Sequence, residues 1–555
     1  MGEIAVRNTG AVNTTCPYCG VGCGVLASPA ADGSVSVEGD PVHPANAGRL
    51  CSKGAALGKT LGEHGRLLHP IVDGRPAGWD AAIKAVASQF SETIDKHGPD
   101  AVAFYVSGQL LTEDYYAANK LMKGFIGSGN IDTNSRLCMA SAVVAHKTAF
   151  GADLVPATYE DVELADLLVL AGHNAAWTHP VLFRRIEAAA REGRRLVCID
   201  PRRTDTVEAS DLHLPLDPQT DVRLWNGLAA WLDRRGAVDS DFLAEHVNGL
   251  TELRAVLAKD DQSVGAVARD CGLPAGDVET FYRWFAETPR AVTLFSQGVN
   301  QSAQGVAKGS AIINAHLLTG KIGKPGAAPF SITGQPNAMG GREVGGLATM
   351  LAAHMDFSDE CRDRVGRFWN APRVATGPGL KAVDLFDAVG RGEIKALWVM
   401  ATNPAVSLPN AGKVRRALEA CEFLVVSDVV AETDTAKHAD ILLPARAWGE
   451  KNGTVTNSDR TISRQRSFLQ APGKALADWR IVAKVAAAMG WGEAFAWEKP
   501  ADVFREWAAL TAFENAGARP LDLGALADMS DAEYEAMQPT RWPCAKDAAP
   551  AGRLF

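Results

Sequence analysis

The chain contains an internal repeat, and this repeat restricts the possible folds more than any other feature of the sequence. Its copies match in three segments: ADLLVLAGHN at 165–174 with IKALWVMATN at 394–403, RRLVCID at 194–200 with FLVVSD at 423–428, and the pattern TDT-x4-D-x3-P starting at 204 and at 433. Short apolar runs that alternate with helical stretches indicate parallel βαβ units. The repeat therefore predicts an α/β protein with two doubly wound, Rossmann-like parallel sheets.

Polar residues end the predicted strands in both copies. Asn174 and Asp200 end two strands of the first copy, and Asn403 and Asp428 end two strands of the second. Open parallel sheets bind ligands beyond the carboxyl ends of their strands, where an acidic residue commonly holds nucleotide hydroxyls. The repeat thus predicts two nucleotide-like ligands, or one active and one vestigial site. The alternative is an ordinary sheet in which these Asp and Asn residues serve as caps.

Four of the ten cysteines form the pattern C-x2-C-x3-C-x27-C near the N-terminus: Cys16, Cys19, Cys23 and Cys51. The glycines between them allow the backbone to wind closely around a metal centre. Structural zinc prefers two separate pairs of cysteines, whereas three close cysteines and a remote fourth suit a [4Fe–4S] cluster better. Unrelated buried cysteines are the remaining alternative. The spacing favours an iron–sulfur cluster over zinc.

Another cysteine, Cys138, lies in NSRLCMASAV, just before a helix-like stretch. The pKa of a thiol near a helix N-terminus is lowered, which suits a nucleophile or a metal ligand. From its position alone, however, a buried structural cysteine is the better interpretation.

Two further loops, at 296–305 and 333–346, combine Gly with Asn and Gln. Glycines let a backbone approach a large flat ligand. Arg342 is the only cation of the second loop, and its guanidinium suits an anion that needs planar, bidentate hydrogen bonding. A flexible linker is the alternative, although such a linker would contain less Asn, Gln and Arg.

Composition excludes several classes of protein. The chain has 555 residues, of which 47% are hydrophobic and 22% charged, so disorder, collagen and coiled coil are excluded. A formal charge of −9 disfavours a nucleic-acid binder. No run of 18 or more apolar residues appears, which predicts no membrane span. The N-terminus lacks an apolar core after a basic start, so we expect a cytoplasmic protein.

Several motifs together resemble the molybdopterin oxidoreductase family. They are CPYCGVGCG at 16–24, CSKG at 51–54, CMASA at 138–142, GHNAAWTHP at 172–180, DPRRT at 200–204 and WGEKNGTVTNSDR at 448–460. Within the family, the chain is similar to assimilatory nitrate reductase catalytic subunits, from Cys16 to about Arg466.

The resemblance implies two cofactors. One is molybdenum held by the dithiolenes of two molybdopterin guanine dinucleotides, one for each copy of the repeat. The other is a [4Fe–4S] cluster on Cys16, Cys19, Cys23 and Cys51. Cys138 then becomes the thiolate ligand of molybdenum, which reverses the structural interpretation given above.

The resemblance also implies roles for other residues. Lys53 would lie on the electron path between cluster and pterin, Arg342 near the substrate funnel, and Met139 beside the metal. Gln297 stands where relatives often have Met, so the cavity lining is expected to differ. The implied pterin and nucleotide contacts are Asn174, His179, Asp200, Asp217, Thr220, Asp221, Gly298, Asn300, Gln301, Gln335, Asn403, Ser427, Asp428, Asp440 and Asn457.

The function implied is reduction of nitrate to nitrite by oxygen-atom transfer, in nitrate assimilation. Electrons would come from a ferredoxin, a flavodoxin or an NADH-linked flavoprotein. The first alternative is a formate dehydrogenase of the same family, in which the metal-binding residue is typically followed by His; here Met139 follows Cys138. The second is a pterin-less electron-transfer subunit, which tends to lack the ligand cysteine.

The expected domains are an iron–sulfur domain at 1–60, an α/β domain formed by 61–150 with 330–470, a second α/β domain at 151–329 and a helical C-terminal segment at 471–555. The β-rich domain that closes over both dinucleotides in the family is expected to be absent.

Overall fold

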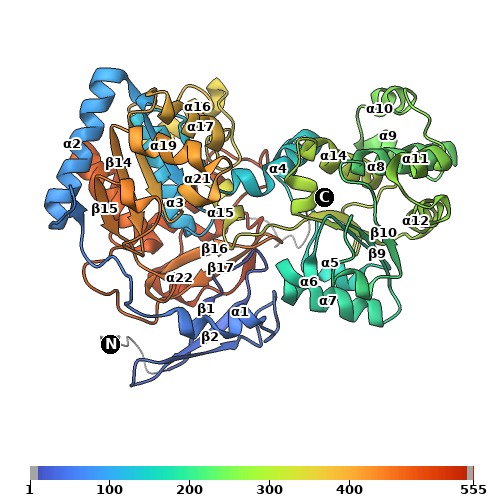
Figure 1. The fold of residues 1–555 in the computed structure, drawn as a ribbon, viewed down its shortest axis with the longest axis horizontal. Coiled ribbons are helices and arrows are strands. Elements are labelled where there is room, and N and C mark those ends of the chain that lie inside the picture. The colour runs from blue at the N-terminus through green and yellow to red at the C-terminus, as the bar shows by residue number, and fades with distance from the viewer. Residues whose placement is uncertain (1–9, 547–553, 555) are drawn as a thin grey trace.

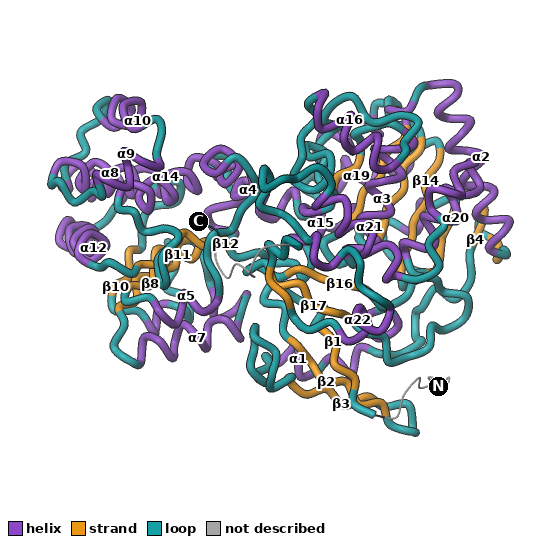
Figure 2. The backbone as a smooth tube through the Cα atoms, turned by 180° about the vertical axis from the view of Figure 1, so that it is seen from behind, coloured by secondary structure: helices purple, strands orange, loops and turns teal. Residues whose placement is uncertain are grey.

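A computed structural model describes residues 10–546 and residue 554. It contains two α/β bodies side by side, and a small N-terminal sheet lies below their junction in Figure 1. Helix α4 (Arg136–Phe150) lies between the two bodies in both views (Figures 1 and 2). The described part of the chain contains no helix that is both long enough and apolar enough to cross a membrane.

The larger body is built on a seven-stranded sheet whose strands come from two separate stretches of the chain. In spatial order they are β5 (Arg75–Pro76), β4 (Ile71–Val72), β15 (Ile441–Pro444), β14 (Phe423–Asp428), β13 (Ala396–Met400), β6 (Val102–Val106) and β7 (Ile131–Thr133). The run from β15 to β7 is parallel, and the β4–β5 hairpin adds an antiparallel edge.

The smaller body is built on a five-stranded sheet that is parallel throughout. Its spatial order is β10 (Leu212–Leu214), β9 (Arg195–Ile199), β8 (Leu167–Ala171), β11 (Ala291–Phe295) and β12 (Ala328–Ser331). The segments of the sequence repeat form β8, β9 and β10 in this sheet and β13, β14 and β15 in the other. The predicted parallel βαβ units are therefore confirmed in both copies.

Both sheets are covered by helices on both faces, because alternate strand residues point to opposite sides. In β8, Leu167 and Val169 join one hydrophobic core, whereas Leu168 and Leu170 join another. The helices on one face of the smaller sheet are α8 (Asp221–Arg234), α11 (Val264–Cys271), α12 (Ala275–Glu287) and α14 (Gly305–Leu318); α5 (Tyr159–Leu164) and α7 (Pro180–Arg191) cover the other.

The larger sheet is covered in the same way. One face packs against α2 (Trp79–His97), α3 (Thr112–Asn119), α20 (Asp478–Ala486) and α21 (Pro500–Ala512), and the other against α17 (Ala382–Gly390) and α19 (Ala411–Ala420). Both bodies are thus doubly wound, as the sequence predicts.

Two antiparallel sheets complete the fold. The N-terminal sheet contains β1 (Val12–Thr15), β2 (Gly24–Pro29) and β3 (Val35–Gly39). The second contains β16 (Gly453–Thr456), β17 (Thr461–Gln465) and β18 (Thr540–Arg541), and it lies between the N-terminal sheet and the larger body (Figure 2). Because β18 belongs to the C-terminal segment, that segment is not purely helical.

Buried charges attach this C-terminal segment to the larger body. Lys451 Nζ lies 2.6 Å from a carboxylate oxygen of Asp478 at the start of α20 and 3.4 Å from Asp114 in α3. Glu113, also in α3, accepts a 2.8 Å hydrogen bond from the Tyr534 hydroxyl in α22 (Asp531–Ala536). Removing one member of a buried charge pair is costly, because its partner is left without compensation.

The TDT motifs of the repeat hold the loops that follow the first strand of each copy. Thr206 Oγ1 donates to Asn174 Oδ1 over 2.9 Å and accepts from Ala176 N. In the second copy, Thr435 Oγ1 donates to Asn403 Oδ1 over 2.7 Å and accepts from the Ala405 N–H. Both threonines are fully buried. The motif is therefore kept in both copies because it fixes the Asn-containing loop.

We expect Thr206→Val and Thr435→Val each to destabilise the chain by about 1–3 kcal/mol. Valine has nearly the same shape as threonine but removes a donor to the Asn oxygen and leaves the backbone N–H of Ala176 or Ala405 without its acceptor. Chemical denaturation followed by circular dichroism measures the change, and Thr→Ser at the same positions, which keeps the hydroxyl, is the control. Equal stability of the Val and Ser variants would contradict this role of the motif.

Candidate functional site

The four N-terminal cysteines lie near the end of the N-terminal sheet, close enough for their charges to act on one another. Cys16 follows β1, Cys23 precedes β2, and Cys51 precedes α1 (Ser52–Ala55). A backbone hydrogen bond of 2.8 Å from Cys16 N to Cys23 O closes the loop that carries Cys19. Burial raises the pKa of Cys16 to about 12, and the neighbouring thiols of Cys19 and Cys51 raise it further. Cys16 and Cys23 are buried, and Cys19 and Cys51 are half-buried. Such neighbouring thiols suit a bound metal, since metal coordination ionises them.

The cysteine loop packs against a turn that is distant in sequence. Ser458 N donates to Gly20 O over 2.9 Å, and Asn457 Nδ2 donates to Val21 O over 3.1 Å. Gly20 cannot carry a side chain here, because a Cβ would lie 2.2 Å from Thr333 O. Asn457 Oδ1 in turn accepts from two backbone N–H groups of its own turn. The structure thus gives Asn457 a role in holding the cysteine loop, where the sequence predicted a nucleotide contact.

Lys53 and His179 lie beside the cysteines. Lys53 is exposed in α1, and its charge acts on Cys16, Cys19 and His179. His179 is buried, and its ring bridges His173 Nε2 (2.9 Å) and Thr333 O (2.7 Å). Burial lowers the pKa of His179 to about 4, so the ring is neutral at pH 7. Lys53 is therefore near enough to both the cysteines and His179 for its charge to act on them.

Cys138 is the third residue of α4, as expected for a thiol at a helix N-terminus, and it is half-buried. Gln297 Nε2 donates to its Sγ over 3.2 Å. A Cβ on Gly334 would lie 3.6 Å from the same sulfur. A hydrogen-bond donor stabilises a thiolate, which is the form that binds a metal. Gln297, whose role the sequence left open, therefore contacts the candidate metal ligand.

Met139 departs from helical geometry (φ −145°, ψ 28°) and kinks α4 directly after Cys138. Its side chain is buried in the core of the smaller body.

Three predicted cofactor contacts instead hold the segment around Cys138. Asn300 Oδ1 accepts from Ala142 N over 2.9 Å, and Gln301 Nε2 donates to Leu137 O over 2.7 Å. Gln335 Oε1 accepts from Ser135 Oγ over 2.7 Å. These side chains use their polar atoms to fix the backbone on both sides of the thiol.

A cavity of about 630 Å³ opens at the carboxyl edge of the smaller sheet. It brings together several residues predicted from sequence: Asn174, Asp200, Asp221, Gly298 and Gln301. Gly172 (φ +55°) and Gly298 meet closely beside it, where a Cβ on Gly172 would lie 2.8 Å from Gly298 backbone atoms. Such a cavity has the position and the polar lining that a nucleotide requires.

Two cations that the sequence does not predict also line this cavity, Arg202 and Lys308. Lys308 is buried in α14, and its Nζ lies 2.7 Å from Asp221 and 3.4 Å from Gly298 O. A single lysine inside a helical pattern carries no sequence signal, so only the packing of α14 against the cavity identifies it. Arg202 belongs to the DPRRT motif and could have been noted there.

Asp217 and Thr220, also predicted contacts, belong to the loop before α8. Asp217 is exposed, and its carbonyl accepts from the Thr220 hydroxyl over 2.7 Å. Neither residue is among those that line the cavity. Their main visible role is to begin α8.

In the second copy, Asn403 and Asp428 lie at the carboxyl edge of the larger sheet, as predicted. Burial raises the pKa of Asp428, whose carboxylate accepts from Val429 N. The Ser427 hydroxyl is buried and accepts from Trp398 Nε1 over 2.8 Å, so it is occupied within the core.

Asp440, another predicted cofactor contact, lies near the amino edge of the larger sheet. Its carboxylate accepts from Leu424 N over 2.7 Å, near the amino end of β14 and therefore at the opposite edge from Asp428. Asp211 of the first copy accepts in the same way from Leu196 N. The repeat keeps this Asp because it fixes the start of the second strand.

Arg342 also differs from its prediction as an open fork for an anion. It lies in α15 (Ala338–Glu343), is 2% exposed, and its Nε donates to Asp153 over 2.6 Å. The charge of Arg342 lowers the pKa of Asp153 below its usual range, although burial raises it. Only Nη1 of the guanidinium lacks a hydrogen-bond partner among the described residues.

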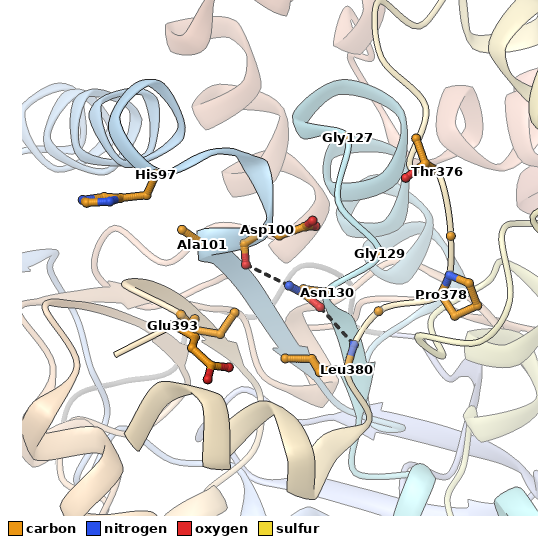
Figure 3. A pocket seen from close by; sticks show the side chains of 13 residues that line it. His97, Asp100, Ala101, Gly127, Gly129, Asn130, Thr376, Pro378, Leu380 and Glu393 are labelled. Carbon is orange, nitrogen blue, oxygen red and sulfur yellow. Dashed lines mark hydrogen bonds between the residues drawn. The ribbon is translucent and has the colours of Figure 1, made fainter. Parts of the chain in front are cut away.

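Another cavity, of about 470 Å³, lies at the amino ends of β6, β7 and β13 (Figure 3). Asn130 bridges it, donating to Asp100 O and accepting from Leu380 N, both over 2.9 Å. It contains none of the predicted site residues, so we do not assign it to the site.

The residues present fit the cofactors that the sequence implies. The four neighbouring thiols suit an iron–sulfur cluster, Cys138 with its Gln297 donor suits a thiolate metal ligand, and the glycine-lined cavity suits the nucleotide end of a pterin dinucleotide.

Comparison with known proteins identifies the family. Residues 9–62 match the molybdopterin oxidoreductase Fe4S4 domain, and residues 66–488 match molybdopterin oxidoreductase. A nitrate reductase of Klebsiella oxytoca is 58% identical over 97% of this chain, and an assimilatory nitrate reductase catalytic subunit of Bacillus subtilis is 30% identical over 99% of it. The chain spans 61% of the Klebsiella protein and 77% of the Bacillus protein.

The fold also matches the solved structure of an acetylene hydratase from Pelobacter acetylenicus. The TM-score is 0.78 at 19% identity, over 95% of this chain and 74% of that structure. The two family matches support a molybdenum–pterin cofactor and a [4Fe–4S] cluster. Together, these matches show that the chain belongs to the molybdopterin oxidoreductase family.

Proposed function

We propose that the chain reduces nitrate to nitrite by oxygen-atom transfer, as the catalytic part of a nitrate reductase. The observation that carries this proposal is Cys138, a half-buried thiol at the start of α4 that Gln297 contacts and the thioether Met139 follows. The likeness to nitrate reductases supports the same substrate. The Bacillus relative supports an assimilatory role, and for such a role we propose a cytoplasmic location.

Separate groups of residues in this chain would hold the cluster, the molybdenum and the two nucleotides. Cys16, Cys19, Cys23 and Cys51 would hold the cluster, which accepts electrons from a ferredoxin, a flavodoxin or an NADH-linked flavoprotein. Cys138 would hold molybdenum, and the bound pterin–molybdenum group would supply the oxygen-atom transfer. Asn174, Asp200 and Lys308 would bind one nucleotide end, and Asn403 and Asp428 the other.

The protein groups around Cys138 would orient the reaction rather than perform it. Gln297 donates a hydrogen bond to the sulfur and so stabilises its charged form. Asn300 and Gln301 fix the backbone on the two sides of Cys138, so that the thiol keeps one position. Small displacements of reacting groups cost rate steeply, which gives these positioning contacts their value.

Nitrate is expected to be the preferred substrate over formate. Formate oxidation requires a group that takes a proton from carbon, and the thioether of Met139 cannot accept one. The test is anaerobic: the loaded protein is reduced with a dye and offered nitrate, and the oxidised protein is offered formate with an acceptor dye. Faster oxidation of formate than reduction of nitrate would replace the proposed function by formate dehydrogenase. Absence of molybdenum from the purified chain would instead favour a pterin-less subunit.

Cys51→Ser is expected to remove the iron–sulfur cluster. The remote thiol closes the set of four ligands, and its loss opens the site to solvent. We expect about four irons per chain and a paramagnetic signal after reduction in the unchanged protein, and neither in the variant. Cys361→Ser, at a half-buried thiol outside the cysteine loop, is the control and should keep both. Stoichiometric zinc without iron in protein purified anaerobically would contradict the assignment.

Lys53→Met is expected to slow electron delivery while iron and molybdenum contents stay unchanged. Methionine is unbranched like lysine but removes the charge that acts on the cysteines and on His179. The loss of a positive charge should shift the cluster potential to more negative values. A tenfold fall in turnover would correspond to about 1.4 kcal/mol in the barrier. Lys59→Met, at another exposed lysine of the same domain, is the control; an unchanged potential in Lys53→Met would exclude the role.

A further inference from the structure

Tyr159, the first residue of α5, carries a buried hydroxyl that contacts the cysteine loop. The residue is 1% exposed and lies in the same hydrophobic core as Cys23. Its hydroxyl donates to Gly20 O over 3.1 Å and to Val21 O over 3.2 Å. Both carbonyl groups belong to the stretch between Cys19 and Cys23. One side chain of the smaller body thus reaches the backbone that joins two of the candidate cluster ligands.

The ring of Tyr159 is held on several sides. It packs against Phe330 in β12, with 5.8 Å between the ring centres, and the Arg185 guanidinium lies 5.7 Å from its centre. The backbone N–H of Tyr159 donates to Asp459 over 3.4 Å. A side chain packed in this way keeps one rotamer, because buried side chains fill the available space closely. The hydroxyl therefore keeps its direction toward the cysteine loop.

The two carbonyl groups do not need this hydroxyl to be hydrogen-bonded. Gly20 O also accepts from Ser458 N and from Ser458 Oγ, both over 2.9 Å, and Val21 O accepts from Asn457 Nδ2 over 3.1 Å. A carbonyl oxygen has two lone pairs, so Gly20 O has more donors than lone pairs. A phenylalanine at position 159 would fill the same space without the cost of burying a hydroxyl. The hydroxyl thus has a role other than pairing these carbonyl groups.

That role is electrostatic. A donating O–H group directs the positive end of its dipole at the acceptor, which here is the backbone of the cysteine loop. Fixed dipoles act strongly in a buried site, because little water is present to screen them. The reduction potential of an iron–sulfur cluster depends on the charge and the hydrogen bonds around it. A positive dipole end stabilises the more negative, reduced cluster and so raises its potential.

The hydroxyl also keeps its proton. Burial raises the pKa of Tyr159 well above its usual value, and the charges of Asp459, Cys19 and Cys23 raise it further. Tyr159 therefore donates its hydrogen bonds at every pH near neutrality, and its effect on the cluster does not change with pH in that range.

We propose that Tyr159 is a positioning residue for electron transfer, which raises the reduction potential of the [4Fe–4S] cluster through the backbone of the cysteine loop. Tyr159 does not touch the cluster ligands through a hydrogen bond; it acts through Gly20 and Val21. The higher potential makes the cluster easier for the electron donor to reduce. This inference concerns the cluster that the Fe4S4 domain match supports, and it does not depend on which substrate the enzyme reduces.

The experiment is a redox titration of the full chain, purified anaerobically with its cofactors, in which the paramagnetic signal of the reduced cluster is followed. In Tyr159→Phe we expect the midpoint potential to shift to a more negative value, while the protein keeps about four irons per chain. The melting temperature should change little, because both carbonyl groups retain other donors. A merely structural role would lower the melting temperature or the iron content and leave the potential of the loaded protein unchanged.

Tyr282→Phe is the matched control. Tyr282 is equally buried, and its hydroxyl also donates to a backbone carbonyl, that of Leu224, over 2.7 Å. It lies in the core around α8 and α12 and makes no contact with the cysteine loop among the hydrogen bonds of the described residues. Its variant should keep the potential of the unchanged protein. An equal shift in Tyr159→Phe and Tyr282→Phe would overturn the inference.

Ser458→Ala provides an independent variant, because it removes another hydroxyl donor to Gly20 O. Its potential should also shift to a more negative value, and an unchanged or more positive potential would contradict the inference. Loss of iron from Tyr159→Phe would overturn it too, because the hydroxyl would then be required to hold the loop. A cluster that shifts as expected in a protein unable to reduce nitrate would overturn the proposed function and leave this inference intact.

Discussion

The segment Thr333–Gln335 is the contact on which the arrangement of the site depends. Thr333 N donates to Ser458 Oγ, Thr333 O accepts from His179, and Gly20 of the cysteine loop packs directly on the same residue. The next residue, Gly334, leaves room for the Cys138 sulfur, from which a Cβ at this position would lie 3.6 Å away. This short stretch after β12 therefore fixes the cysteine loop, the first repeat and the N-terminus of α4 relative to one another. The two candidate redox centres are placed by one piece of backbone.

The general fold, the four-cysteine motif and Cys138 could be predicted from the sequence. The repeat gave the parallel sheets, because apolar runs of strand length alternate with helical patterns regardless of what the loops bind. The cysteine spacing and the position of Cys138 at a helix start are local features, so they can be recognised in the sequence without knowledge of the tertiary structure. Lys308 could not be predicted, because its role comes only from the packing of α14 beside the cavity.

Several predicted cofactor contacts are polar residues whose hydrogen bonds are used within the protein. The family resemblance implies a contact at Asp440, and its carboxylate accepts from the backbone at the start of β14. The Ser427 hydroxyl likewise accepts a hydrogen bond from Trp398, and the Asn457 amide donates one to the cysteine loop. A sequence motif shows that a polar side chain is needed but not whether its partner is a ligand or the backbone. The repeat preserved the bonds of the scaffold at least as well as the ligand contacts.

The distinction between satisfied and unsatisfied buried polar atoms therefore separates the two kinds of site residue. Asn300, Gln301 and Gln335 have their partners within the chain, and their function is to hold Cys138 in place. By contrast, His173 Nδ1 and Thr333 Oγ1 have no hydrogen-bond partner among the described residues. A buried polar atom without a hydrogen bond has lost its interactions with water, so it is kept only where another interaction offsets that cost. The chain thus uses satisfied amides to hold Cys138, and it leaves unpaired polar atoms on His173 and Thr333, beside the segment that fixes the two candidate redox centres.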